Sequence, residues 1–260
     1  MPRLLLRVAY DGTAYAGWQR QLNGPSIQAC LEAALAPLAG APVTVHGAGR
    51  TDAGAHAEGQ MAHVDLPEGL LPETVQRAAN ARLPTDIRVR AVRLVPDTLH
   101  ARFDAVGKSY RYRWLVSPVG HPLLGRTSAL VPPPLDVAAM DQACAALIGT
   151  HDFAAFQSTG THVATTIRTM TMARVRERAS QAGDVVALAS VERLVEFDIA
   201  GDGFLRHMVR ALAGTLLAVG QGRASSSGLG ALLAGRTRRE AGPTAPAHGL
   251  TLVDVAYRLE

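Results

Sequence analysis

Residues 49–56 read Gly-Arg-Thr-Asp-Ala-Gly-Ala-His, and residues 60–66 read Gln-Met-Ala-His-Val-Asp-Leu. The first stretch predicts a tight turn that carries the Asp52 carboxylate beside Arg50, because Gly54 can adopt backbone angles closed to other residues. The second predicts a half-buried strand in which two sets of side chains alternate, Met61, His63 and Asp65 against Ala62, Val64 and Leu66. A turn that leads directly into a strand would hold the Asp52 carboxylate oxygens in a fixed position.

The segments around this turn complete a β-α-β-α-β unit in the first hundred residues. Residues 3–10 are typical of a strand, and Ser26 is a suitable N-cap for a helix to about Leu38. Pro72 opens a second helix to about Arg82, and residues 87–94 alternate as another strand.

The second half repeats this organisation over a longer stretch. The expected elements are strands at 109–116, 167–175, 191–199 and 249–259, a helix from Asp136 to about Ile148, a helix after Gly203, a short helix at 229–234 and a hairpin loop at 180–184. The helix after Gly203 carries Arg206 and Arg210 one turn apart.

Composition predicts a globular protein of one large domain or two smaller ones, because 260 residues with 48% hydrophobic and 18% charged side chains can bury a full core. The sequence shows no secretory leader and no apolar run of membrane-spanning length, which favours a cytoplasmic protein with no membrane partner. Cys30 and Cys144 lie far apart in apolar segments, so two buried, reduced thiols are expected.

The net charge is +4, and every basic side chain except Lys108 is an arginine. Arginine pairs with phosphate in a bidentate manner and stacks on bases, which favours a nucleic-acid partner. A coding bias that replaces lysine by arginine explains the same composition, so charge alone leaves both interpretations open.

Five motifs, in this order, resemble the TruA-type tRNA pseudouridine synthases. They are Tyr10-Asp11-Gly12-Thr13 with Gly17-Trp18-Gln19, residues 49–56, Lys108-Ser109-Tyr110-Arg111-Tyr112, His151-Asp152-Phe153, and residues 203–210. The similarity runs nearly end to end, and five separated motifs are far more specific than the aspartate turn alone. Ala55 stands where family members commonly carry valine.

The resemblance implies an α+β fold of two ferredoxin-like or RRM-like α/β domains, residues 1–106 and 107–260, whose antiparallel sheets flank a central RNA-binding cleft. It implies isomerisation of uridine to pseudouridine at positions 38, 39 and 40 of the tRNA anticodon stem-loop, with tRNA as partner, a homodimer, no metal and no cofactor.

The resemblance also implies a role for each site residue. Asp52 takes the essential aspartate role, as nucleophile on the sugar or the ring or as a base at the ribose. Arg210 pairs with Asp52, Tyr110 stacks on the target base, and Arg50 contacts a phosphate or the flipped nucleotide. Asp52 from the first half would then meet Tyr110 and Arg210 at the boundary between the domains.

Simpler interpretations of the same residues stay open. Asp52 can be only a turn former, Arg210 can extend from its helix into solvent, and Tyr112 with Trp114 is expected to be sheet packing. Asp52, His56, His63 and Asp65 could form a metal-dependent hydrolase, although their spacing matches no zinc pattern. A non-catalytic RNA-binding protein is the other alternative, but the chain lacks the aromatic string of RRM sheets.

Overall fold

The computed structural model describes residues 1–22, 24–158, 160, 163–178, 192–235 and 237–258. Its contacts divide the chain into two compact units, Met1–Lys108 with Thr251–Glu260, and Ser109–Leu250. The sequence-based division at 106/107 differs from this grouping at the C-terminus, where Thr251 onward belongs with the first unit. No helix among the described residues is long and apolar enough to cross a membrane.

The first unit contains the β-α-β-α-β succession that the sequence predicts, with one additional short strand. Its elements are β1 (Arg3–Tyr10), α1 (Ile27–Ala39), β2 (His46–Gly47), β3 (His56–Asp65), α2 (Pro72–Arg82), β4 (Ile87–Val95) and, from its second residue on, β10 (Leu250–Tyr257). The strands follow the order β4-β1-β3-β10, and β2 pairs with β3. Pairing is antiparallel except between β3 and β10, where Thr251 lies opposite His56.

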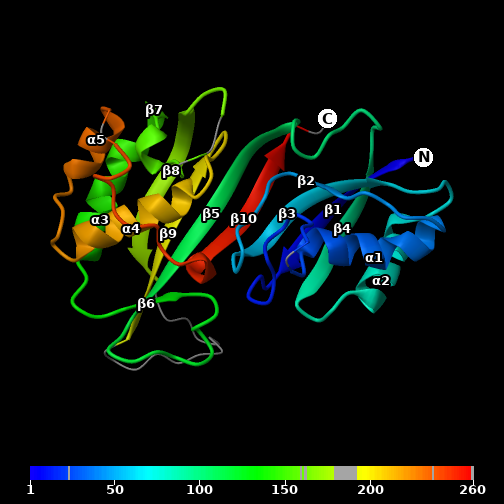
Figure 1. Ribbon diagram of the computed structural model, residues 1–260, viewed down its shortest axis with the longest axis horizontal. Coiled ribbons are helices and arrows are strands. Elements are labelled where there is room, and N and C mark those ends of the chain that lie inside the picture. The colour runs from blue at the N-terminus through cyan, green and yellow to red at the C-terminus, as the bar shows by residue number, and fades with distance from the viewer. Residues whose placement is uncertain (23, 159, 161–162, 179–191, 236, 259–260) are drawn as a thin grey trace. The chain divides into compact units, whose positions relative to one another are not determined.

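Local chemistry explains the helix ends of this unit. The Ser26 hydroxyl accepts a hydrogen bond from the backbone nitrogen of Ala29, so it caps α1, and Gly40 ends the helix in the left-handed conformation at φ 66°. Pro72 occupies the first turn of α2, where its missing N–H is no loss. Helices α1 and α2 contact each other beside the strands (Figure 1).

Strand β3 corrects the expectation of a half-buried strand. Six consecutive residues from 59 to 64 are buried, including Gln60 and His63. Both faces of β3 are therefore covered. On one face the His63 ring packs against His46 and His100, and on the other Ala62 and Val64 are buried. The alternation in the sequence therefore separates two buried faces, one with Met61 and His63 and one with Ala62 and Val64, rather than an exposed face from a buried one.

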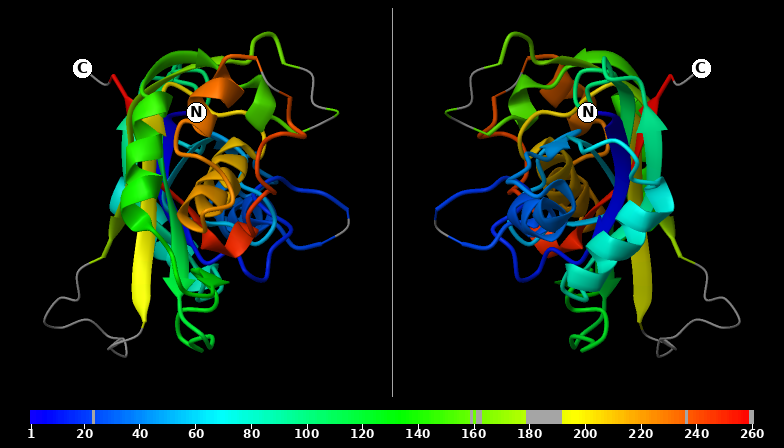
Figure 2. Two further views of the ribbon diagram at one scale, coloured as in Figure 1. Left: turned by 90° about the vertical axis from the view of Figure 1, so that its left-hand side faces the viewer. Right: turned by 90° about the vertical axis from the view of Figure 1, so that its right-hand side faces the viewer.

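The second unit is also a mixed α/β structure. Its elements are β5 (Ala105–Val116), which begins in the first unit, β6 (Ala129–Val131), α3 (Val137–Cys144), η1 (Ala145–Leu147), β7 (Gly149–Asp152), η2 (Ala154–Phe156), β8 (Ile167–Glu177), β9 (Arg193–Gly201), α4 (Met208–Gly220), α5 (Gly228–Leu233) and η3 (Ala247–Gly249). The strand order is β5-β9-β8-β7, with β6 parallel to the end of β5. The left view of Figure 2 faces this unit, with its helices in green and orange. The α+β class expected from the sequence is confirmed.

One expectation for this unit is corrected by the structure, and another concerns residues outside the described ranges. Helix α4 begins at Met208 rather than just after Gly203, because His207 adopts a left-handed backbone at φ 62° that no helix can include. Phe204, Leu205 and Arg206 therefore precede the helix. The hairpin loop expected at 180–184 lies outside the described residues, while β8 and β9 pair antiparallel as predicted.

Candidate active site

The stretch that carries Asp52 is a tight turn, as predicted. Gly54 has a φ of 78°, and the backbone nitrogen of Ala55 donates to the Asp52 carbonyl oxygen over 3.1 Å. The Asp52 side chain is half-buried, whereas Arg50 is exposed. The turn thus presents a half-buried acidic side chain next to the buried Thr51.

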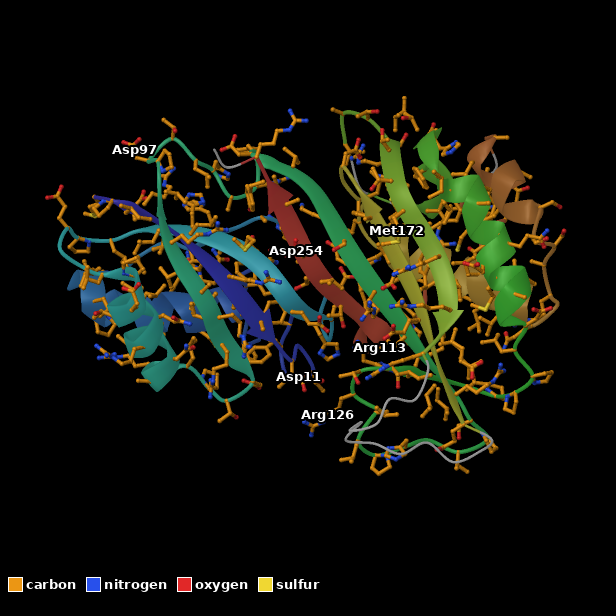
Figure 3. All side chains as sticks on the ribbon, turned by 180° about the vertical axis from the view of Figure 1, so that it is seen from behind. Asp11, Asp97, Arg113, Arg126, Met172 and Asp254 are labelled. Carbon is orange, nitrogen blue, oxygen red and sulfur yellow. The ribbon has the colours of Figure 1, made fainter. Side chains whose placement is uncertain are left out.

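The segment after β1 holds the far end of this turn. A Cβ built on Gly12 would lie 1.9 Å from the carbonyl oxygen of Ala55, so only glycine permits this approach. The Gly12 backbone nitrogen donates over 3.1 Å to Nδ1 of His56, whose ring is buried. Asp11, next to it in the chain, follows the end of β1 (Figure 3).

The near end of the turn is held by a second glycine and by a buried hydroxyl pair. A Cβ on Gly17 would lie 2.6 Å from the Thr51 carbonyl oxygen, and that oxygen accepts a 3.2 Å hydrogen bond from the Trp18 backbone nitrogen. The hydroxyls of Thr51 and Tyr10 lie 2.8 Å apart in the interior. Burial raises the pKa of Tyr10 to about 12, so its phenol stays neutral.

Lys108 holds the segment that leads into the turn. Its Nζ donates over 2.9 Å to the carbonyl oxygen of Ala48, and Gln60 Nε2 donates over 2.9 Å to that of Gly49. Burial lowers the pKa of Lys108, and the nearby Arg102 adds to this shift. In the sequence, Gly12, Gly17 and Lys108 stand out only as members of the motifs. Single glycines such as Gly12 and Gly17 can mark a close approach of two backbone segments, and this was the available signal for the contacts with Ala55 and Thr51.

Tyr110 and Arg210 both belong to the second unit. The half-buried Tyr110 lies on β5, and its ring packs edge to face against Phe204 with 4.9 Å between ring centroids. Arg210 lies in the first turn of α4, and its Nε donates over 2.7 Å to the Ala245 carbonyl oxygen. Their expected meeting with Asp52 stays a prediction, because Asp52 belongs to the first unit.

Tyr112 and Trp114 pack in the sheet of the second unit, as the simpler interpretation predicts. Neither is exposed, and their ring centroids lie 5.0 Å apart. The Tyr112 hydroxyl donates over 2.9 Å to the Pro246 carbonyl oxygen. Burial raises the pKa of Tyr112, and the positive charge of Arg210 opposes this shift.

The arginine pattern of β5 also has a structural explanation. Arg111 Nε lies 2.7 Å from Asp198 Oδ1, and Arg113 Nε lies 3.0 Å from Glu196 Oε1. Both carboxylates are buried on β9, and Arg174 and Arg176 of β8 approach them from the next strand. Arg113 is visible on β5 in Figure 3. These arginines balance buried acids, so the basic composition does not by itself identify RNA contacts.

The residues proposed for a metal-dependent hydrolase do not gather in one place. Asp65 forms a fork with Arg3 at 2.7 and 2.8 Å, and His56 is bonded to Gly12. Within the described ranges, the group of side chains close enough to share an ion is His46, His63 and His100, whose ligand atoms lie within 4.8 Å of one another.

Hydrogen bonding makes the His46–His63–His100 group a support rather than a metal centre. Nδ1 of His63 accepts from the Ala101 backbone nitrogen, and Nδ1 of His100 accepts from that of Arg102, both over 3.1 Å. A neutral ring that accepts at Nδ1 carries its proton on Nε2, so neither ring keeps a lone pair for a metal. The rings instead pack on each other, with centroids 4.8 Å apart for His46–His63 and 4.7 Å for His63–His100.

Comparison with known proteins identifies relatives that span this site. A family described as tRNA pseudouridine synthase matches residues 7–104 and 143–258. The tRNA pseudouridine synthase A of Oleidesulfovibrio alaskensis is 45% identical, over 99% of this chain and 97% of that protein. The proteins of the same name from Syntrophotalea carbinolica (45% identical, 97% and 95% covered) and Myxococcus xanthus (44%, 99% and 93%) are similar over comparable lengths.

Proposed function

Because this chain belongs to the tRNA pseudouridine synthase family, we propose that it is an isomerase that converts uridine to pseudouridine in tRNA. The observation that carries the proposal is the position of Asp52 on a turn that Gly12 and Gly17 contact closely, while Lys108 bonds the segment that leads into it. Such fixed positioning is what an intramolecular rearrangement requires of its catalytic group.

The reaction needs an acid-base group and a held base but no redox partner. The bond between N1 of uracil and C1′ of ribose breaks, the base turns, and C5 bonds to C1′. The proton on C5 is then lost and N1 gains one, so the product is an isomer and no cofactor is consumed. Asp52 acts as nucleophile on the sugar, as nucleophile on the ring, or as a base at the ribose.

The second unit would supply the partners of Asp52. An ion pair with Arg210 keeps a carboxylate ionised when the substrate excludes water. Tyr110 is half-buried and packed against Phe204, which gives it a fixed ring on which the target base can stack. Arg50 is exposed next to the turn and is suited to a phosphate or to the flipped nucleotide.

The finer parts of the proposal concern position, assembly and compartment. Uridines 38, 39 and 40 of the anticodon stem-loop are the expected targets, a homodimer is the expected assembly, and the cytoplasm is the expected compartment. Transcripts in which only one of these uridines remains would show which are converted. Sedimentation velocity would show the assembly, and a monomer with full activity would contradict the dimer.

Tritium release from tRNA labelled at C5 of uridine tests the catalytic role. Asp52→Ala and Asp52→Asn should abolish release, while the native chain should stay active in the presence of a chelator. Asp97→Asn is a matched control, since Asp97 is an exposed aspartate of the same unit (Figure 3). Release by Asp52→Ala equal to that of the native chain would refute the assignment.

A further inference from the structure

An exposed aromatic side chain stands on a rigid turn of the first unit. Phe103 has 73% of its surface exposed, although most large apolar side chains of the unit are buried. It lies between β4 and β5, in a turn where the Phe103 and Asp104 backbone nitrogens both donate to the His100 carbonyl oxygen over 3.1 Å. The His100 backbone nitrogen donates to Asp104 Oδ2 over 2.6 Å. Phe103 therefore presents an apolar ring to solvent on a backbone that these hydrogen bonds fix.

Two hydrogen bonds connect the same turn to the interior of the first unit. The Ala101 backbone nitrogen donates to the buried His63 ring, and its carbonyl oxygen accepts a 2.6 Å hydrogen bond from the Tyr257 hydroxyl. His100 packs its ring against Phe103 with 4.3 Å between centroids. The Phe103 ring is thus supported by a neighbour and preorganised, which lowers the entropic cost of stacking another flat group on it.

One exposed cation lies beside the Phe103 ring. The exposed Arg102 holds its Cζ 5.7 Å from the ring centroid. Burial, followed by the charges of His46 and Arg3, lowers the pKa of His100 and favours its neutral ring, with Asp104 acting in the opposite sense. A flat apolar ring beside an exposed guanidinium offers a base a stacking surface and its phosphate a cation.

Two connections join this turn to the chain that leads into Asp52. The His46 ring, six residues before Asp52, packs on His63, which packs on His100. Arg102 adds to the lowering of the Lys108 pKa that burial causes, and Lys108 Nζ donates to the Ala48 carbonyl oxygen. Asp52 lies four positions after Ala48 in the chain, so their Cα atoms are at most about 14 Å apart.

We infer that Phe103 and Arg102 form an RNA-contact platform, on which an unstacked base of the substrate lies against Phe103 while an adjacent phosphate pairs with Arg102. The inference rests on the proposed function, since it assigns a contact of the same RNA that Asp52 modifies. Phe103 takes no part in bond making; it binds a nucleotide other than the reacting one.

Steady-state kinetics of tritium release tests the platform. Phe103→Ala should raise the KM for tRNA about 5- to 150-fold, the range for loss of one stacked base, and leave kcat within about twofold. Phe103→Tyr should retain the native KM. Leu94→Ala is the control, because Leu94 is 64% exposed on β4 of the same unit and has no assigned role. An unchanged KM for Phe103→Ala would overturn the inference.

Fluorescence gives a readout that does not depend on turnover. The two tryptophans of the chain, Trp18 and Trp114, are buried, so Phe103→Trp introduces an exposed indole with a separate emission. Added tRNA should quench that emission, and Arg102→Gln should lower the slope of log Kd against log salt by about 0.7 to 0.9. Quenching without tritium release by the native chain would leave the platform standing and refute only the catalytic proposal.

A protein-facing role for Phe103 predicts a different result. If Phe103→Ala changes the sedimentation coefficient while the affinity for tRNA and the KM stay native, the ring is an assembly contact and the RNA platform is wrong. The melting temperature of Phe103→Ala should equal that of the native chain, because an exposed side chain at a bonded turn contributes little to folding.

Discussion

Gly12 approaches Ala55 so closely that a Cβ on Gly12 would lie 1.9 Å from the Ala55 carbonyl oxygen. The two residues are far apart in the sequence, and the contact joins the segment after β1 to the turn that carries Asp52. The position of the proposed catalytic carboxylate therefore depends on a residue that has no side chain to take part in chemistry.

Gly12→Ala should displace the turn and destabilise the protein. The new methyl group would collide with backbone rather than with a flexible side chain, and overpacking of this kind costs about 1 to 3 kcal/mol. We expect a lower unfolding midpoint in urea and a loss of tritium release larger than the stability change explains.

Gly230→Ala is the matched control for Gly12→Ala. Gly230 lies in α5, and the nearest atom to a Cβ there is Ala146 Cβ at 3.9 Å, an ordinary contact. Alanine should stabilise this helix by about 0.5 to 1 kcal/mol. If both alanine variants behaved alike, the Gly12–Ala55 contact would have no special role.

The buried hydroxyl pair of Tyr10 and Thr51 should show energetic coupling. Removal of either hydroxyl deprives the other of this bond, which costs up to about 3 kcal/mol, whereas removal of both is less costly than the sum. The Gln60 side chain also bonds the Tyr10 hydroxyl, so Thr51→Val should cost less than Tyr10→Phe. Free energies of unfolding for Tyr10→Phe, Thr51→Val and the double variant measure the coupling. Strictly additive values would show that the 2.8 Å contact contributes nothing.

The free energy of unfolding should decrease at acidic pH, and His63 should contribute to this decrease. Its ring is buried, and burial followed by the charge of Arg3 lowers its pKa from 6.5 to about 4. The unfolded chain therefore binds a proton that the folded chain rejects, so this contribution is present above pH 6.5 and is lost as the pH falls toward 4. The expected loss between pH 7 and pH 5 is about 2 kcal/mol.

Urea unfolding of the native chain and of His63→Gln at both pH values measures the His63 contribution. The glutamine variant should lose less stability than the native chain on going from pH 7 to pH 5. Equal losses would assign the pH dependence to other groups.

The buried carboxylate of Glu196 should depend on Arg113. Arg113→Met removes the cation 3.0 Å from Glu196 Oε1, while Arg111 and Arg176 remain 3.5 and 3.4 Å from Glu196 Oε2. The loss should therefore be about 1 to 3 kcal/mol, the cost of leaving one hydrogen bond of a buried group unmade. The double variant Arg113→Met with Glu196→Met should recover part of that loss. Arg174→Met is the control, since Arg174 is about half exposed and lies 3.6 Å from Asp198, and it should cost less than about 1 kcal/mol.

Local patterns determined most of the elements of this protein. Ser26 as an N-cap, Pro72 at a helix start and the alternation of residues 3–10 act within a few residues, so they could be interpreted without tertiary information. The Asp52 turn could also be predicted locally, because its positive backbone angle falls on Gly54, a residue type that adopts it without strain. The family followed from the order of the motifs and is confirmed by the comparisons.

Only the tertiary structure decided which faces are covered and which distant residues meet. The alternation in β3 could not show that both of its faces are buried, since covering depends on elements elsewhere in the chain. The left-handed His207 delays α4 although its apolar spacing extends further back. The contacts of Gly12 with Ala55 and of Lys108 with Ala48 join residues far apart in the chain, and no periodicity in a sequence encodes a pairing of that kind.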